Sequence, residues 1–153
     1  MSASPTSPSE SLFSRPFDEL EEGARFVCAP RVLSDADVLA FAELTGDHHP
    51  LHVDDAFASA GPFGRRIAHG LLVLSAAAGQ VPLDAQRVLA LRRVSDAVFK
   101  RPVFPGGAIH VEGRLASLKP VSDEAGLVGC ALSVADEGGR TVARATLELL
   151  WAR

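Results

Sequence analysis

The stretch HGLLVLSAAAGQV, residues 69–81, restricts the possible folds more than any other part of this 153-residue chain. It contains no proline, and its spacing of apolar residues predicts a helix that ends before Pro82. Apolar or small side chains occur on nearly all sides of this helix, and a helix of that kind is expected to be buried. The rest of the chain must therefore supply a layer that covers it.

The residues after Pro82 supply that layer as a series of strands. Along residues 128–134, Val, Cys, Leu and Val alternate with smaller residues, and a period of two indicates a strand with one inward face. The tripeptide EGG at 137–139 is typical of a hairpin. We expect an α+β fold in which an antiparallel sheet wraps around the helix at 69–81. The predicted strands are RVLALRRV, DAVFKRPVF, AIHVEGRLASL, LVGCALSVA and RTVARATLELLWA.

The first third of the chain contains a second predicted helix between two capping residues. Ser34 can cap its start together with Asp37, and Gly46 is placed to end it. Before it, Ala24–Leu33 predicts a strand that is interrupted near a proline. Residues 1–14 are rich in serine and proline, which predicts a disordered tail and leaves residues 15–153 as a single domain.

Composition excludes several classes of function. The net charge is −4 and the 15 basic residues form no long run, so nucleic acid is not an expected partner. The N-terminus lacks the basic start and apolar run of a signal peptide, and no stretch reaches the roughly 20 apolar residues of a membrane span. We therefore expect a cytoplasmic protein, with Cys28 and Cys130 as buried free thiols.

The stretch LTGDHHPLHVDD packs three histidines and three carboxylates around one proline. A metal site is one interpretation, although His48 and His49 are neighbours that usually point apart, and no zinc-like spacing follows. A solvated turn is the second interpretation. The third is an acid–base pair, because the turn at the proline can hold Asp47 and His52 near one substrate. The pattern alone leaves all three open.

Two longer stretches resemble the MaoC-like hydratases, the (R)-specific enoyl-CoA hydratase family. FAELTGDHHPLHVDDAFASAGPFGRRIAHGLL is similar to a G-D-x-N-P-x-H-x-D segment followed by F-G-x-x-I-x-H-G. FKRPVFPGGAI, residues 99–109, is similar to F-x-x-P-V-x-P-G-D-x-I. The likeness runs from about Phe26 to Trp151. It implies a hot dog fold, in which an antiparallel sheet wraps around one helix, as the patterning predicts.

The resemblance also implies an activity. In this family the aspartate and histidine that match Asp47 and His52 share one water, and they hydrate trans-2-enoyl thioesters to (R)-3-hydroxyacyl thioesters or run the dehydration. The backbone N–H of Gly70 would bind the enolate oxygen, because the N-terminus of a helix favours negative charge. No cofactor and no metal are expected, apart from the coenzyme A or carrier-protein phosphopantetheine of the substrate. The expected assembly is a homodimer or larger homo-oligomer.

The chain departs from the family pattern at four positions that bear on substrate choice. His49 replaces an asparagine, Arg66 a proline and Gly107 an aspartate, and Ala78 stands where some hydratases carry a serine. These changes leave room for a specialised dehydratase in a biosynthetic pathway.

Several side chains near the motif are further candidates for binding or structural roles. Arg65 and Arg66 are candidates for binding the phosphates of the carrier, because arginine matches phosphate geometry, and His49 is a further candidate for contacting substrate. His69 is expected to hydrogen-bond at the start of its helix. Two other functions are kept beside the hydratase: an acyl-thioester-binding hot dog protein without catalysis, and a thioesterase.

Overall fold

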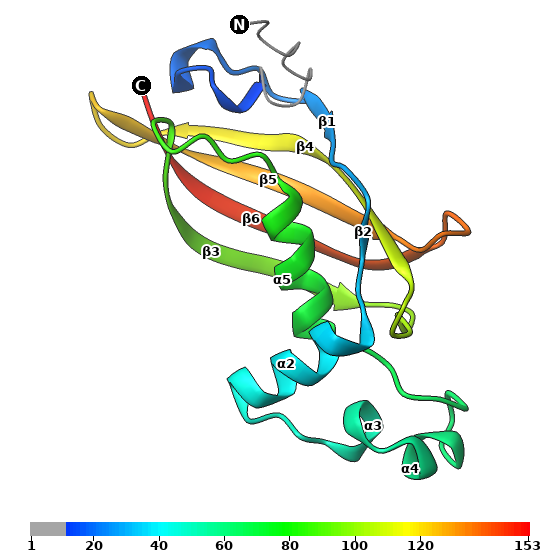
Figure 1. Cartoon of the computed structure of the whole chain (residues 1–153). Coiled ribbons are helices and arrows are strands. Elements are labelled where there is room, and N and C mark those ends of the chain that lie inside the picture. The colour runs from blue at the N-terminus through cyan, green and yellow to red at the C-terminus, as the bar shows by residue number, and fades with distance from the viewer. Residues whose placement is uncertain (1–11) are drawn as a thin grey trace, which may run out of the picture.

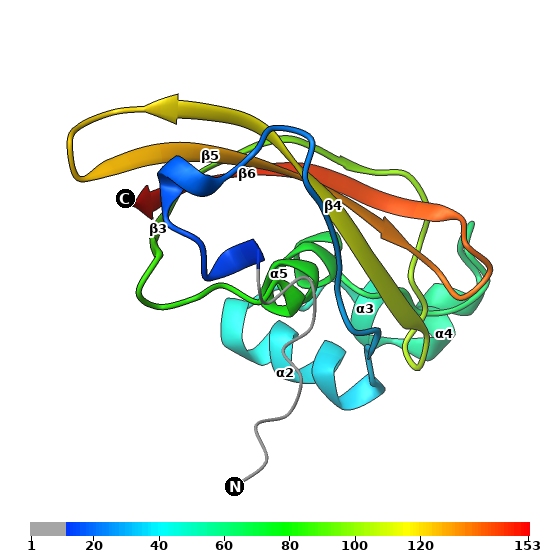
Figure 2. The ribbon, with the colours of Figure 1, turned by 90° about the horizontal axis from the view of Figure 1, so that it is seen from above.

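Helix α5 (Gly70–Gln80) lies on the concave side of a curved antiparallel sheet, as Figures 1 and 2 show for the computed structural model. The structure describes residues 12–153. In that part of the chain, no helix is long and apolar enough to cross a membrane. The other helices are η1 (Phe17–Glu19), α2 (Asp35–Thr45), α3 (Pro50–Val53) and α4 (Asp55–Ser59).

The sheet has the strand order β1-β4-β5-β6-β3, and β2 pairs with β4 beside this path. All of the pairings are antiparallel. The predicted α+β hot dog arrangement, with a sheet wrapped around one helix, is therefore confirmed. The strands are β1 (Arg25–Val27), β2 (Arg31–Val32), β3 (Val88–Phe99), β4 (Ala108–Pro120), β5 (Ala125–Ala135) and β6 (Thr141–Ala152).

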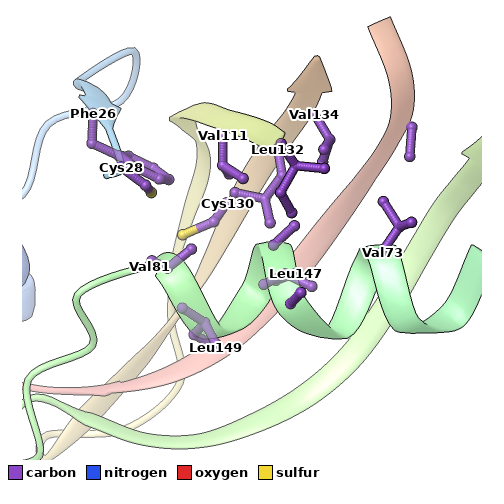
Figure 3. Packing of buried hydrophobic residues seen from close by; sticks show 14 of the residues in the cluster. Phe26, Cys28, Val73, Val81, Val111, Cys130, Leu132, Val134, Leu147 and Leu149 are labelled. Carbon is purple, nitrogen blue, oxygen red and sulfur yellow. The ribbon is translucent and has the colours of Figure 1, made fainter. Parts of the chain in front are cut away.

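The core lies between α5 and the inner face of the sheet (Figure 3). Val73 comes from the helix, and Leu132 and Leu147 come from β5 and β6. Cys28 and Cys130 are both buried free thiols, as predicted. Burial raises the pKa of the Cys130 thiol to about 12, so this side chain behaves as a small apolar residue.

The prediction that α5 is buried on every side is wrong for one side. Leu71 is 63% exposed, and Ser75 is also exposed. The reason is geometric, because a single sheet covers only the side of the helix that faces it. Within residues 12–153, the side of α5 that carries Leu71 is therefore exposed to solvent.

Strand β3 also differs from the sequence prediction. RVLALRRV and DAVFKRPVF were expected as two strands, but Val88–Phe99 is one strand with several register shifts against β6. Asp96 lies at one of these shifts and has a φ of 54°. β3 ends the order of strands, and Leu89 and Leu91 are exposed on it. It is an apolar edge strand with an irregular backbone.

The predicted tail ends too late. Leu12 and Phe13 are buried in the core, and the Phe13 ring lies 5.5 Å from that of Trp151. The indole N–H of Trp151 donates to the main-chain carbonyl of Arg15 at 2.9 Å. Leu12 and Phe13 therefore pack into the core through their apolar side chains. Residues 1–11 of the predicted tail lie outside the described part of the chain.

The local signals around α2 are confirmed. The Ser34 hydroxyl accepts the N–H of Asp37 at 3.1 Å, and the Asp37 carboxylate accepts the N–H of Ser34 at 2.9 Å. At the other end Gly46 has a φ of 79°, which favours glycine because it has no Cβ. The break near Pro30 separates β1 from β2. Because α2 ends at its C-cap Gly46, the next residue, Asp47, lies directly beyond the end of the helix.

Candidate active site

Asp47 is positioned by short-range hydrogen bonds just after α2. Its N–H donates to the Thr45 hydroxyl at 3.2 Å, and that hydroxyl donates to the Phe41 carbonyl at 2.7 Å. One oxygen of the Asp47 carboxylate accepts the N–H of His49 at 3.2 Å. Within residues 12–153, the other oxygen has no hydrogen-bond partner. The carboxylate is exposed and is therefore available to a ligand.

His49 starts the short helix α3, which carries His52. The Nδ1 atom of His49 accepts the N–H of Leu51 at 3.1 Å, and Pro50 occupies the first helical position. An asparagine oxygen is also a favoured acceptor at such a helix start. The imidazole thus supplies the capping acceptor that the family's usual asparagine can provide. This explains locally how the chain tolerates a histidine at position 49.

His52 is half-buried and presents one unprotonated nitrogen. Its Nδ1 lies 2.8 Å from the carbonyl oxygen of Ile67, and because a carbonyl only accepts, Nδ1 carries the proton. Nε2 then has a free lone pair. Burial lowers the pKa of His52, although the bond to Ile67 and the charge of Asp47 oppose this change. The imidazole is therefore a neutral base at neutral pH.

Sequence reasoning missed the position of His69. His69 lies at the start of α5, but its side chain makes no cap on that helix. Instead its Nε2–H donates to the carbonyl of Asp47 at 3.0 Å, and its ring stacks on that of His52 with 3.9 Å between centroids. The sequence did offer one signal for this position. A histidine directly before a buried apolar helix is expected to be buried together with the start of that helix.

Gly70 is the first residue of α5, and its N–H has no hydrogen-bond acceptor within the described range, residues 12–153. The Phe99 ring packs against it so closely that a Cβ would lie 3.0 Å from ring atoms. A hollow of about 190 Å³ borders Gly70, Phe99 and Val103. A larger residue would thus have to displace the Phe99 ring, and the N–H of Gly70 can serve an oxyanion.

The structure brings Asp47, His52 and His69 together, with one ligand-type atom of each within 4.8 Å of the others. Zinc needs nitrogen atoms at about 2 Å in the plane of each imidazole. The stacked rings of His52 and His69 have planes only 26° apart, so one ion that close cannot lie in both planes. The cluster fits hydrogen bonding better than metal binding. His48 lies outside it, exposed and 3.5 Å from Glu43.

The two arginines have different surroundings. Arg66 binds Asp35 at 2.6 Å and Asp55 at 2.7 Å, and it donates to the main-chain carbonyl of His52 at 3.0 Å. These hydrogen bonds raise the pKa of Arg66 and occupy its guanidinium, so it holds α3 in place. Arg65 lies over the Phe104 ring and stays exposed on one side. Only Arg65 remains well placed for a phosphate.

The fold and the site define a class: a hot dog protein with an aspartate and a histidine beside the start of its central helix. The family described as MaoC like domain matches residues 20–132. The chain belongs to this MaoC-like family.

Relatives of known name agree with this family. The 3-hydroxybutyryl-CoA dehydratase of Methylorubrum extorquens is 36% identical over 124 residues, which is 79% of this chain and 76% of that protein. Protein MaoC of Klebsiella aerogenes is 37% identical over 65% of this chain, which spans only 30% of that protein's length.

Solved structures are similar over most of the chain. The monoamine oxidase regulatory protein of Archaeoglobus fulgidus has a TM-score of 0.86 at 32% identity and covers 91% of this chain and 95% of its own. The (R)-hydratase of Aeromonas caviae has a TM-score of 0.72 at 29% identity, with 86% and 96% covered.

Proposed function

We propose that this protein is a hydro-lyase that hydrates trans-2-enoyl thioesters to (R)-3-hydroxyacyl thioesters, or dehydrates them in a biosynthetic pathway. The observation that carries the proposal is the placement of one Asp47 carboxylate oxygen and one His52 ring nitrogen within 4.8 Å of each other, close to the start of α5. The names of the Methylorubrum and Aeromonas relatives support the same reaction.

The proposed reaction uses one water between Asp47 and His52. The Nε2 atom of His52 takes a proton from the water as its oxygen bonds to C3 of the enoyl group. The electron pair moves to the thioester oxygen, and the N–H of Gly70 binds this enolate oxygen. The proton on His52 then passes to the Asp47 carboxylate, and Asp47 gives this proton to C2 as the enolate collapses, which restores the starting state.

One assay separates the proposed reaction from its two alternatives. The protein is incubated with crotonyl-CoA, and the enoyl absorbance and the free thiol are followed together. A hydratase lowers the enoyl absorbance without releasing thiol. A thioesterase releases thiol, and a non-catalytic thioester-binding protein changes neither signal. Either of these two results would contradict the proposal.

The carrier end of the substrate is proposed to bind near Arg65 and Lys100. Lys100 borders the same hollow as Gly70. The Arg65 guanidinium, unlike that of Arg66, binds no carboxylate within residues 12–153, and it donates to the carbonyl of Pro105 at 3.3 Å. We expect Arg65→Ala and Lys100→Ala to raise KM for crotonyl-CoA and to leave KM for the crotonyl thioester of pantetheine unchanged, because pantetheine lacks the phosphates. An equal rise for both substrates would contradict a phosphate contact.

The working form is proposed to be a homodimer. β3 is an edge strand with exposed Leu89, Leu91 and Val94, and such an edge favours pairing with a second copy. Light scattering at micromolar concentration should give twice the mass of the chain, and Leu91→Lys should lower it. A monomeric wild-type protein would contradict this proposal.

No metal and no cofactor are proposed for the reaction, and the cytoplasm is the proposed location. The stacked geometry of His52 and His69 supports the absence of a metal from the mechanism. Activity should persist after treatment with a chelator. Stoichiometric zinc by elemental analysis, together with loss of activity in the chelator, would overturn the acid–base mechanism.

A further inference from the structure

Among residues 12–153, His69 is the only buried polar or charged residue, and 2% of its surface is exposed. Its Nδ1 atom is buried without a hydrogen-bond partner in this part of the chain. A buried nitrogen without a partner is unfavourable, and an apolar side chain in the same space would avoid the cost. The imidazole must therefore provide something that an apolar side chain cannot.

The contacts of His69 show what that is. The Nε2–H bond to the carbonyl of Asp47, at 3.0 Å, fixes the main chain that carries the carboxylate. The ring lies against His52, with 3.9 Å between centroids and 26° between planes. The other neighbour of the ring is Phe41, at 4.9 Å, and the next residue in the chain is Gly70. One side chain thus connects all three groups of the proposed site.

We propose that His69 is a positioning residue that sets the distances between Asp47, His52 and the N–H of Gly70. The three groups come from three segments: the residue after α2, helix α3 and the start of α5. The substrate must meet all three at once, and a displacement of about 1 Å can lower the rate by about 10². This proposal rests on the hydratase function proposed above.

The stacked ring has a second effect on His52. It covers one face of the imidazole, and a proton on His69 would repel one on His52. Burial is the main cause that lowers the pKa of His52, and His69 and His49 lower it further, whereas the Ile67 carbonyl and Asp47 raise it. Removing the ring should therefore raise the pKa of His52.

Two substitutions separate the hydrogen bond from the ring. His69→Phe keeps a stacked ring and loses the donor to Asp47. His69→Gln keeps a donor of similar reach and loses the ring. His48→Gln is the matched control, because His48 is an exposed histidine of the same loop, paired with Glu43 and absent from the cluster.

The kinetic readout is turnover of crotonyl-CoA. We expect His69→Phe to lower kcat by about 10- to 10²-fold with little change in KM, because it disturbs geometry and not substrate binding. His69→Gln should retain a higher kcat than His69→Phe, since its amide can still donate to Asp47. His48→Gln should keep the wild-type kcat.

The second readout is the pKa of His52, measured by NMR titration of the histidine ring protons and assigned with His52→Gln. It should rise most in His69→Gln, where water reaches the uncovered face, and less in His69→Phe. The acid limb of the pH profile of kcat/KM should move in the same order. A residue needed only for folding would not move this limb.

Three outcomes would overturn the proposal. One is a folded His69→Phe with the kcat of the wild type. Another is equal loss of kcat in both variants with an unchanged pKa for His52. If circular dichroism shows that His69→Phe does not fold, His69→Gln decides, and a wild-type pKa for His52 in that variant contradicts the proposal. Wild-type protein without activity on crotonyl-CoA would instead remove the proposed function, and the NMR titration would still test the ring contact.

Discussion

The loop that carries the proposed catalytic groups and the strand pair β5–β6 are held in place by different interactions. Between Thr45 and His69, most side chains are exposed or half-buried, and hydrogen bonds and ion pairs set their positions. In β5 and β6 most of the inward side chains are buried and apolar. Polar contacts of this kind fix geometry with little net free energy, whereas apolar burial supplies most of the stability.

Because different interactions hold the two regions, activity and stability should be separable in this protein. Substitutions in the loop should lower turnover in a protein that still folds. Substitutions in the strand pair should lower the free energy of unfolding and leave turnover per folded molecule nearly unchanged.

The largest effect is expected at Asp47 and His52. Asp47→Asn and His52→Gln should each lower kcat by about 10²–10⁴, the range for one acid–base group. Both groups act on the same water in the proposed mechanism, so the double variant should be only slightly worse than the poorer single one. Steady-state kinetics on crotonyl-CoA, with circular dichroism for folding, measures this. If the two losses multiply, the groups act independently and the shared-water mechanism is wrong.

The next effect is on stability and comes from the strand pair. Leu147 is 2% exposed and faces α5, so Leu147→Ala leaves a cavity in the core. We expect a loss of about 2–5 kcal/mol in the free energy of unfolding, measured by urea denaturation. The kcat of the folded fraction should stay close to that of the wild type. A kcat that falls as far as in Asp47→Asn would mean that the two regions are not separable.

Arg66→Lys should have an intermediate effect on activity. A lysine ammonium cannot make the three bonds with which Arg66 joins Asp35, Asp55 and the carbonyl of His52. We expect kcat to fall by about 10-fold or somewhat more, because α3 is displaced. Arg65→Lys is the matched control, and its kcat should be unchanged. Similar losses in both variants would mean that the bonds of Arg66 to Asp35, Asp55 and His52 are not the cause of the loss.

A smaller effect is expected in the pH dependence of stability. The pKa of His52 is lowered in the folded protein, so between its ordinary value of about 6.5 and the folded value the unfolded chain binds more protons. The free energy of unfolding should therefore fall as the pH drops below about 6.5. In His52→Gln this part of the fall should disappear.

Other lowered pKa values do not interfere in that pH range. Those of Asp37 and Asp136 are lowered by hydrogen bonds to Ser34 and Arg140, and the stability they contribute is lost only near or below pH 4. Urea titrations of wild type and His52→Gln at pH 7.5 and 5.5 give the comparison. An identical fall in both proteins would show that His52 is not the titrating group.

The smallest effect is expected for His49→Asn. The Nδ1 atom of His49 caps α3 by accepting the N–H of Leu51, and asparagine is a favoured residue at that position. Activity and stability should both remain near wild type. His49→Ala removes the acceptor and should lower the free energy of unfolding by about 1 kcal/mol. An inactive His49→Asn with a nearly normal His52→Gln would mean that the base is His49.

The features that the sequence predicted well are those set by near neighbours. The caps at Ser34 and Gly46 depend on residues within one helical turn, and the alternation in β5 and β6 follows directly from the geometry of a strand. The pair Asp47 and His52 could be picked out because the chain between them is short. Its identification still depended on resemblance, since loop composition alone did not separate three interpretations.

The features that the sequence did not predict depend on distant parts of the chain. Nothing near Leu91 indicates that β3 ends the sheet, because strand order is a property of the whole fold. The bond from His69 to Asp47 joins residues 22 positions apart, and its partner is a main-chain carbonyl without a sequence signature. The guanidinium of Arg66, in the segment between α4 and α5, is likewise occupied by carboxylates from helices α2 and α4.

The thiol of Cys130 has a practical consequence. It is fully buried in β5, and its pKa of about 12 leaves almost no thiolate at neutral pH. An alkylating reagent reacts with the thiolate, so it can modify Cys130 only after the strand has opened to solvent. The rate of alkylation therefore measures how often the core opens under native conditions. The protein thus carries a natural reporter of rare opening events, which needs no engineered label and is buried, whereas the Asp47 carboxylate is exposed.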